Sequence, residues 1–282
     1  MVAIAGRRPV GVARRPPPSL SPVSWRFALT PKWLVRHVVV AALVVTMVFL
    51  GLWQLRRLDE KKDYKALVEA RQEAPIADVD DVVPAGEPVG SPAVEEVLYR
   101  SVRATGTYEA DDTVVVENRT YSSAPGAWVL TPLRLTDGTA VVVNRGFIGY
   151  DRSGEIVPPE PPTGRVTVEG LVFPSQTRGR FGATDPAEGT LTVLARVDLE
   201  RYAAQLEGPV LPAYIQLVTS EPAEPPPASG APELVALGPP EPDLGPHLSY
   251  AGQWFLFTAI AAGGYALLLR RVARDEARQP AA

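Results

Sequence analysis

Hydrophobic residues form two long runs, at residues 37–55 and 248–269, and basic residues lie beyond both runs. As α-helices the runs would extend about 28 Å and about 33 Å, at about 1.5 Å per residue. A helix of this length crosses a hydrocarbon core of about 30 Å. The pattern therefore predicts transmembrane helices over 37–55 and 247–269. A cleaved signal peptide is the alternative for the first run, but residues 53–57 (WQLRR) offer no small-residue cleavage site.

Between the two hydrophobic runs the pattern of hydrophobic and polar residues changes several times. Residues 56–73 continue a helix, residues 74–97 form an acidic loop rich in Pro and Gly, and residues 221–246 form a Pro-rich tether. Residues 98–220 alternate short runs of Val, Thr and aromatic residues with turn residues, which is typical of β-strands. The predicted strands cover residues 99–108, 113–118, 128–135, 139–148, 165–173, 191–197 and 214–219.

Two short sequence patterns add detail to the predicted β-rich domain. Asp137-Gly138 lies between two predicted strands and favours a tight hairpin turn. Asp198 is placed to cap a short helix over residues 199–207. The predicted fold class is therefore an α+β membrane protein. Two transmembrane helices flank one antiparallel β-rich domain, a sandwich or a partly open barrel with a short helix.

Charge indicates which side of the membrane each part occupies. Residues 1–36 hold seven basic residues and no acid, residues 270–282 hold four Arg and two acids, and residues 56–246 carry a net charge of −13. Because basic flanks stay in the cytoplasm, we expect both tails inside and residues 56–246 outside. An acid-free, Arg-rich N-terminus also fits a mitochondrial transit peptide. The prolines at 16–18 and 22 break an amphipathic helix, which favours a bacterial plasma membrane over the mitochondrial inner membrane.

Cysteine and histidine counts exclude several function classes. The chain has no Cys, and its two His are His37 and His247. Disulfides, Cys-based metal sites, iron–sulfur clusters and c-type haem attachment are therefore excluded. The outer domain holds neither residue type, which excludes a Ser–His or Cys–His hydrolase there. We predict a protein that is not an enzyme; an enzyme or ligand sensor using carboxylates of residues 98–219 is the weakest alternative.

Two polar and aromatic clusters lie where the predicted helices meet the outer surface. Topology places Trp53, Gln54 and His247 at one depth and His37 at the opposite end. His247, Tyr250 and Trp254 share one helix face. The aromatic residues also fit an interfacial belt.

The polar residues of these clusters carry more information than the aromatic ones. Gln54 and Gln253 are amides near hydrocarbon, where such groups usually have a partner. A His at that depth can ligate a haem iron. In the second helix Ala259 and Gly263 are four residues apart, and we expect such small residues to pack against the first helix or, as the alternative, against a different membrane protein.

The order of these motifs resembles the SURF1 family (Surfeit locus 1, Shy1 in yeast), assembly factors of cytochrome c oxidase. The first-helix pattern G-x-W-Q-x-x-R and the second-helix pattern H-L-x-Y-A-x-Q-W-F are both present, and an R…P-G…T-P-L stretch and an N-R-G-F stretch lie between them. The matching residues are Gly51, Trp53, Gln54, Arg57, Arg119, Pro125, Gly126, Thr131, Pro132, Leu133, Asn144, Arg145, Gly146, Phe147, His247, Leu248, Tyr250, Ala251, Gln253, Trp254 and Phe255. Many members have Asn before the His, whereas this chain has Gly245-Pro246.

The resemblance implies help in building the haem a-containing subunit of an aa3-type cytochrome c oxidase, with transient binding and handover of haem a. Subunit 1 of the oxidase and haem A synthase are the implied partners. His247 becomes the candidate axial ligand of the haem iron, the only metal implied. The remaining candidate haem contacts are Trp53, Gln54, Arg57, Tyr250, Gln253, Trp254 and Arg145.

Two alternatives stay open at this point. For Arg145 the alternative to a haem propionate contact is a structural ion pair within the β-rich domain. For the whole chain the alternative is a stably bound accessory subunit of an oxidase supercomplex that carries no haem of its own.

Overall fold

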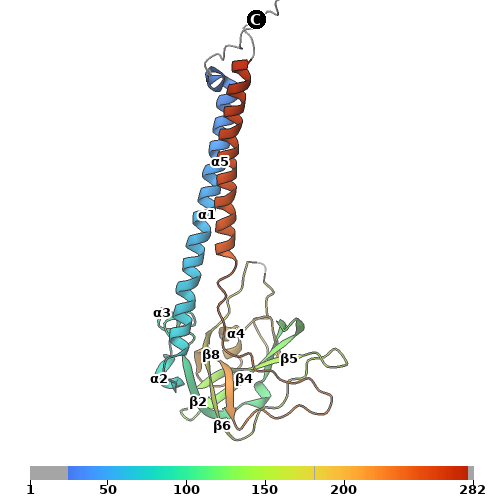
Figure 1. Cartoon of the computed structure of the whole chain (residues 1–282). Helices are drawn as coiled ribbons and strands as arrows, with labels where there is room; N and C mark the ends of the chain where they lie inside the picture. The colour runs from blue at the N-terminus through green and yellow to red at the C-terminus, as the bar shows by residue number, and fades with distance from the viewer. Residues whose placement is uncertain (1–24, 181, 279–282) are drawn as a thin grey trace, which may run out of the picture. The chain divides into compact units, whose positions relative to one another are not determined.

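The computed structural model describes residues 25–180 and 182–278. The chain forms two compact units, Met1–Glu60 with Leu244–Ala282, and Lys61–Asp243 (Figure 1). The residues predicted as basic tails lie partly outside the described residues, at 1–24 and 279–282.

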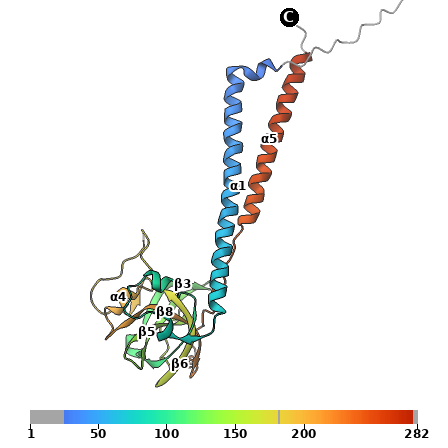
Figure 2. The ribbon, with the colours of Figure 1, turned by 90° about the vertical axis from the view of Figure 1, so that its left-hand side faces the viewer.

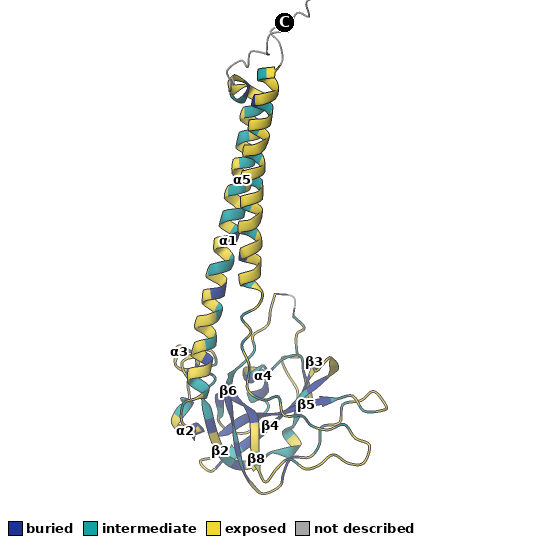
Figure 3. Ribbon diagram, in the orientation of Figure 1, coloured by how far each residue is buried: buried dark blue, intermediate teal, exposed yellow. Residues whose placement is uncertain are grey.

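The first unit is a pair of long helices preceded by the short 3-10 helix η1 (Arg26–Leu29). Helix α1 spans Pro31–Gln72, so the predicted ranges 37–55 and 56–73 belong to one continuous helix, and helix α5 spans His247–Arg278. Both are long and apolar enough to cross a membrane, and only 6% and 0% of their most apolar stretches are buried (Figure 3). Such exposure distinguishes them from the core helix of a soluble protein.

The two helices lie side by side in antiparallel directions, and one glycine marks their close approach (Figures 1 and 2). A Cβ atom on Gly51 of α1 would lie 2.7 Å from the ring of Phe255 on α5. Our expectation that the small residues of α5 make this contact is wrong, because a Cβ on Gly263 or Gly264 would meet nothing within 4 Å. At this close approach the small residue is Gly51 of α1.

The second unit is built on a closed five-stranded β-barrel. The sheet order is β1-β2-β6-β8-β5-β4-β3-β7, and β2 also pairs with β4, which closes the ring β2-β6-β8-β5-β4. The strands are β1 (Ala77–Asp78), β2 (Ser101–Tyr108), β3 (Val114–Tyr121), β4 (Ala124–Leu135), β5 (Ala140–Gly149), β6 (Arg165–Pro174), β7 (Val193–Leu194) and β8 (Val210–Glu221).

This architecture corrects two details of the predicted fold class. The domain is β-rich, as predicted, but it is a closed barrel and not a sandwich or a partly open barrel. Nor is it fully antiparallel, because β5 and β8 pair in parallel within the ring. The predicted hairpin is confirmed: β4 and β5 pair antiparallel, and Gly138 takes a φ of 88° in the turn between them.

The buried apolar residues form three clusters, and alternation along β5 places neighbouring side chains in two of them. Val141 and Val143 of β5 pack into the larger apolar cluster with residues of β2, β6 and β8, whereas Val142 packs with β3 and Tyr202. Tyr202 belongs to helix α4 (Leu199–Ala203), which is capped by the side chain of Asp198. Because successive side chains point to opposite faces of a strand, β4, β5 and β8 contribute to both clusters.

The connections hold more structure than the sequence pattern predicts. The predicted loop 74–97 contains the short helices α2 (Val79–Val82) and α3 (Pro92–Glu95). The strand expected at 191–197 shrinks to β7. Residues 222–240 run back along the barrel and are attached to it, since Phe147 and Val235 exchange two backbone hydrogen bonds of 2.8 Å. We refer to residues 222–240 as the strap.

Candidate functional site

Gln54 of α1 and His247 of α5 are joined by a hydrogen bond. His247 Nδ1 lies 2.8 Å from Gln54 Oε1. Because an amide oxygen only accepts, Nδ1 carries the proton and donates it. In neutral imidazole the lone pair then resides on Nε2. No hydrogen-bond partner of Nε2 is found within the described residues, so this nitrogen could accept a metal ion while the other is held by the hydrogen bond to Gln54.

The surroundings of His247 are apolar and open. Trp53 is 50% exposed and Tyr250 is 46% exposed, whereas Ala251 is buried. Gly245 takes a φ of 66°, and a Cβ there would lie 3.4 Å from His247 Nε2. The glycine thus forms the turn before α5 and leaves space beside the nitrogen that bears the lone pair.

The other candidate haem contacts near His247 differ in how far they are exposed. Trp254 is half-buried and Gln253 is exposed. Arg57 is paired with Glu60 at 2.7 Å, and its side chain is 49% exposed. An exposed pair of this kind contributes little to stability, so Arg57 remains available to an acidic ligand.

His37 has a different environment from His247, because both of its ring nitrogens have partners. Nδ1 lies 2.5 Å from the hydroxyl of Tyr265 on α5, and Nε2 lies 3.0 Å from the carbonyl oxygen of Ala28. Along α1, His37 and Gln54 are about 26 Å apart, and along α5, His247 and Tyr265 are about 27 Å apart. The two hydrogen bonds therefore fix one register of the helix pair. The sequence alone assigns no role to His37, although the polar ring of Tyr265 within an apolar run indicates a residue in need of a partner.

Arg145 belongs to the barrel unit, and the structure shows the ion pair that we weighed as the alternative to a propionate contact. Its Nη2 lies 2.5 Å from a carboxylate oxygen of Glu224, and its Nε lies 3.0 Å from the other. The remaining donors reach the carbonyls of Pro159 and Glu160 at 2.8 and 3.2 Å. Arg145 is 0% exposed at its side chain. A propionate would have to displace Glu224, and the haem contact of Arg145 stays a prediction.

The N-R-G-F stretch as a whole holds the strap. Arg145 binds Glu224 near the beginning of the strap, and Phe147 bridges Val235 further along. Gly146 allows the strap to approach, because a Cβ there would overlap the carbonyl oxygen of Val235. Burial raises the pKa of Tyr108 beneath Arg145, and the Glu224 carboxylate raises it further. Nothing in the sequence indicates that Glu224 pairs with Arg145, because Glu224 is one of several acids in a Pro-rich segment.

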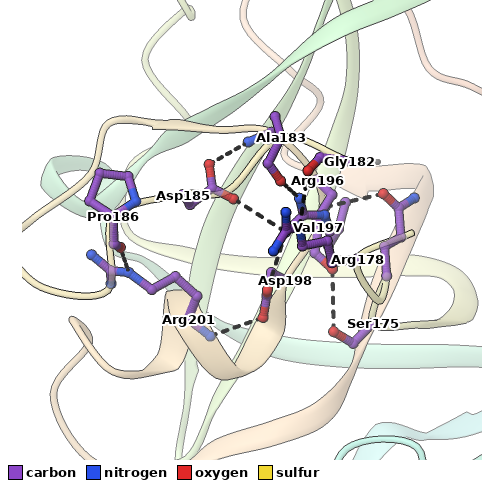
Figure 4. Close-up of polar contacts among 12 residues, drawn as sticks. Ser175, Arg178, Gly182, Ala183, Asp185, Pro186, Arg196, Val197, Asp198 and Arg201 are labelled. Carbon is purple, nitrogen blue, oxygen red and sulfur yellow. Dashed lines mark hydrogen bonds and ion pairs between the residues drawn. The ribbon is translucent and has the colours of Figure 1, made fainter. Parts of the chain in front are cut away.

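Polar contacts also order the segment between β6 and β8 (Figure 4). Arg196 lies 3.7 Å from the carboxylates of both Asp185 and Asp198, and Asp185 accepts from the backbone of Ala195 at 2.8 Å. Arg178 folds back onto the carbonyl of Gly182 at 2.9 Å. The carboxylates of Asp185 and Asp198 thus stabilise the conformation of this loop. Among the described residues, no group of three or more His, Cys, Asp or Glu side chains could hold a metal ion.

In sequence order the chain is a protein with two apolar helices flanking one β-barrel domain, and the two helices are joined by the His247–Gln54 contact. The family model described as "SURF1 family" matches residues 41–259. The chain therefore belongs to the SURF1 family, which is generally known for cytochrome oxidase assembly.

Relatives agree with this membership. An uncharacterized SURF1-like protein of Mycobacterium bovis is 27% identical over 243 residues, which cover 84% of this chain and 83% of the relative. A SURF1-like protein of Monosiga brevicollis is 28% identical over 148 residues, covering 47% of this chain and 52% of the relative. A SURF1-like protein of Rickettsia felis is 25% identical over 155 residues, covering 53% of this chain and 62% of the relative.

Proposed function

We propose that this protein is a membrane-inserted assembly factor for the haem a-containing subunit of cytochrome c oxidase, and that it holds haem a through His247 before handing it over. The single observation that carries the haem assignment is the hydrogen bond from His247 Nδ1 to Gln54, which leaves Nε2 with its lone pair. Family membership supports the link to the oxidase. Subunit 1 and haem A synthase are the partners we propose, in a bacterial plasma membrane with residues 56–246 outside.

The donor set at His247 fits a haem. A neutral imidazole nitrogen is a common axial ligand of haem iron, and the exposed rings of Trp53 and Tyr250 offer apolar contacts to a macrocycle. Arg57 is exposed and can pair with a carboxylate. When bound, haem a would supply an iron centre destined for the oxidase. The residues of this chain orient the imidazole, set its tautomer and provide the apolar surface around it.

His247→Ala tests the ligand assignment, with His37→Ala as the matched control. After co-expression with haem A synthase, we expect the wild type and His37→Ala to purify with a haem absorption spectrum and His247→Ala to lose it. Oxidase activity of the membranes should fall only with His247→Ala. An unchanged haem spectrum and unchanged oxidase activity in His247→Ala would show that the assignment is wrong. Stoichiometric co-purification with the oxidase but without haem would instead favour an accessory subunit.

Gln54→Leu tests the role of the amide. Removing the acceptor leaves His247 Nδ1 without its partner, so the ring orientation and the tautomer are no longer fixed. Loss of such a supporting contact typically costs about 10–100-fold in affinity. We expect weaker haem retention of this size in a haem titration. The control Thr46→Val should retain wild-type affinity, because the Thr46 hydroxyl bonds the Ala42 carbonyl of its own helix at 2.8 Å. Equal affinities of the two variants would contradict a role for Gln54.

A further inference from the structure

The last turns of α5 carry an arginine-lined cavity that the haem site does not use. It has a volume of about 470 Å³ and is lined by Leu267, Arg270, Arg271, Arg274, Asp275 and Arg278. We call these residues the arginine pocket. Four of its six residues are Arg, and they follow directly on the apolar stretch of α5.

The charge of this pocket is largely uncompensated. Among the described residues its only ion pair joins Arg271 to Asp275 at 3.9 Å, with side chains 83% and 59% exposed. The other three guanidinium groups have no carboxylate within ion-pair distance in the described chain. Attraction to the C-terminal end of the helix dipole acts within the last turn, so it does not account for Arg270, two turns before the end of α5.

The helix pair places further basic residues at the same end. The hydrogen bond between Tyr265 and His37 sets the beginning of α1 beside the end of the apolar stretch of α5. Next to His37, the guanidinium of Arg36 lies 4.6 Å from the ring centroid of Trp33. A Trp beside basic residues at the end of an apolar helix is typical of the level of lipid headgroups.

We propose that the arginine pocket binds the phosphates of an anionic phospholipid. This inference rests on the membrane insertion proposed above. Guanidinium groups bind phosphate oxygens through two parallel hydrogen bonds, and basic pockets at the cytoplasmic ends of membrane helices select anionic headgroups. Leu267 in the pocket wall is 65% exposed and Leu268 is 47% exposed. These apolar side chains beside the arginines match the acyl chains of a lipid, which a free phosphate ion lacks.

The test measures lipid retained by the full-length protein. The wild type is purified in mild detergent, and bound phospholipid is identified and counted by native mass spectrometry. We expect anionic phospholipid on the wild type and at least about a tenfold loss when all four Arg become Gln. The matched control changes Lys61, Lys62 and Lys65 to Gln, which removes positive charges near the other end of the apolar segment of α1, and it should retain the lipid.

Replacing the four Arg with Lys separates phosphate recognition from simple charge. This variant keeps the charge that orients the helix, and it lacks the planar guanidinium fork. We expect a several-fold loss of anionic lipid relative to the wild type. If the Lys variant or the Gln variant retains as much anionic phospholipid as the wild type, the proposed lipid site is wrong. An excess of inorganic phosphate that displaces the lipid identifies an adventitious anion site and also overturns it.

The two proposals fail separately. Extraction of the protein from membranes by alkaline carbonate would contradict membrane insertion, on which the proposed function depends. A protein that resists extraction and loses haem with His247→Ala, but keeps its lipid in the Arg variants, overturns the arginine pocket alone.

Discussion

Replacing Arg145 with alanine should destabilise the barrel unit by about 3–5 kcal/mol, which is typical of breaking a buried ion pair. The guanidinium is fully buried and makes both contacts to Glu224 and two to backbone carbonyls. Removing it leaves Glu224, whose side chain is only 19% exposed, with no cation beside it. The attachment of the strap to β5 weakens at the same time.

Denaturant unfolding of the full chain in detergent, with hydrogen exchange of the β5 amides as the local readout, measures this loss. Arg103→Ala is the matched control, because the Arg103–Glu169 pair joins neighbouring strands but is 47% and 34% exposed. We expect it to cost at most about 1 kcal/mol. Equal losses in the two variants would contradict a structural role for Arg145 beyond that of a surface pair.

Gly106→Val should open the barrel, with a loss of about 3 kcal/mol or more. Gly106 lies opposite Leu135 where β2 pairs with β4, the pair that closes the ring. A Cβ at this position would overlap the carbonyl oxygen of Arg134, which belongs to the backbone and cannot turn aside. The strands must separate, so the closing pair loses hydrogen bonds as well as packing.

Gly149→Ala provides the control for this substitution. Gly149 ends β5, its φ is not positive, and a Cβ there would meet nothing within 4 Å. We expect no loss and a small gain, because alanine reduces the freedom of the unfolded chain. Protection of β2 amides from hydrogen exchange should fall in Gly106→Val alone. A Gly106→Val protein with wild-type protection would show that the ring does not depend on this contact.

Local patterns predicted most strands because runs of Val, Thr and aromatic residues lie between turn residues. Alternate burial is clearest in β2, whereas β5 is buried at every residue from Ala140 to Ile148, and Asp137-Gly138 favoured its pairing with β4. No local sequence pattern predicts that the strands close into a barrel. Closure depends on β2 meeting β4 and on β5 meeting β8 in parallel, and both pairings join segments far apart in the chain.

The sequence predicts those contacts of the candidate site that depend only on how far along each apolar helix a residue lies. Placing both helices across one apolar layer brings Gln54 level with His247, and the structure joins them. The partners of Arg145 were not predictable, because an acid in a Pro-rich segment gives no sign of which cation it meets. The close approach at Gly51 was missed for a similar reason. Small residues occur on both helices, and sequence spacing does not say which of them faces the neighbour.

The position of β8 in the ring has a consequence for synthesis. β8 is the last strand in the sequence, yet it lies between β6 and β5 and bonds to both. The barrel therefore cannot close before residue 221 has left the ribosome, and pairings of such long range form slowly. α5 begins at His247, so at about 5–20 residues per second it follows within a few seconds. Closure of the barrel and synthesis of α5 thus follow each other within seconds during translation.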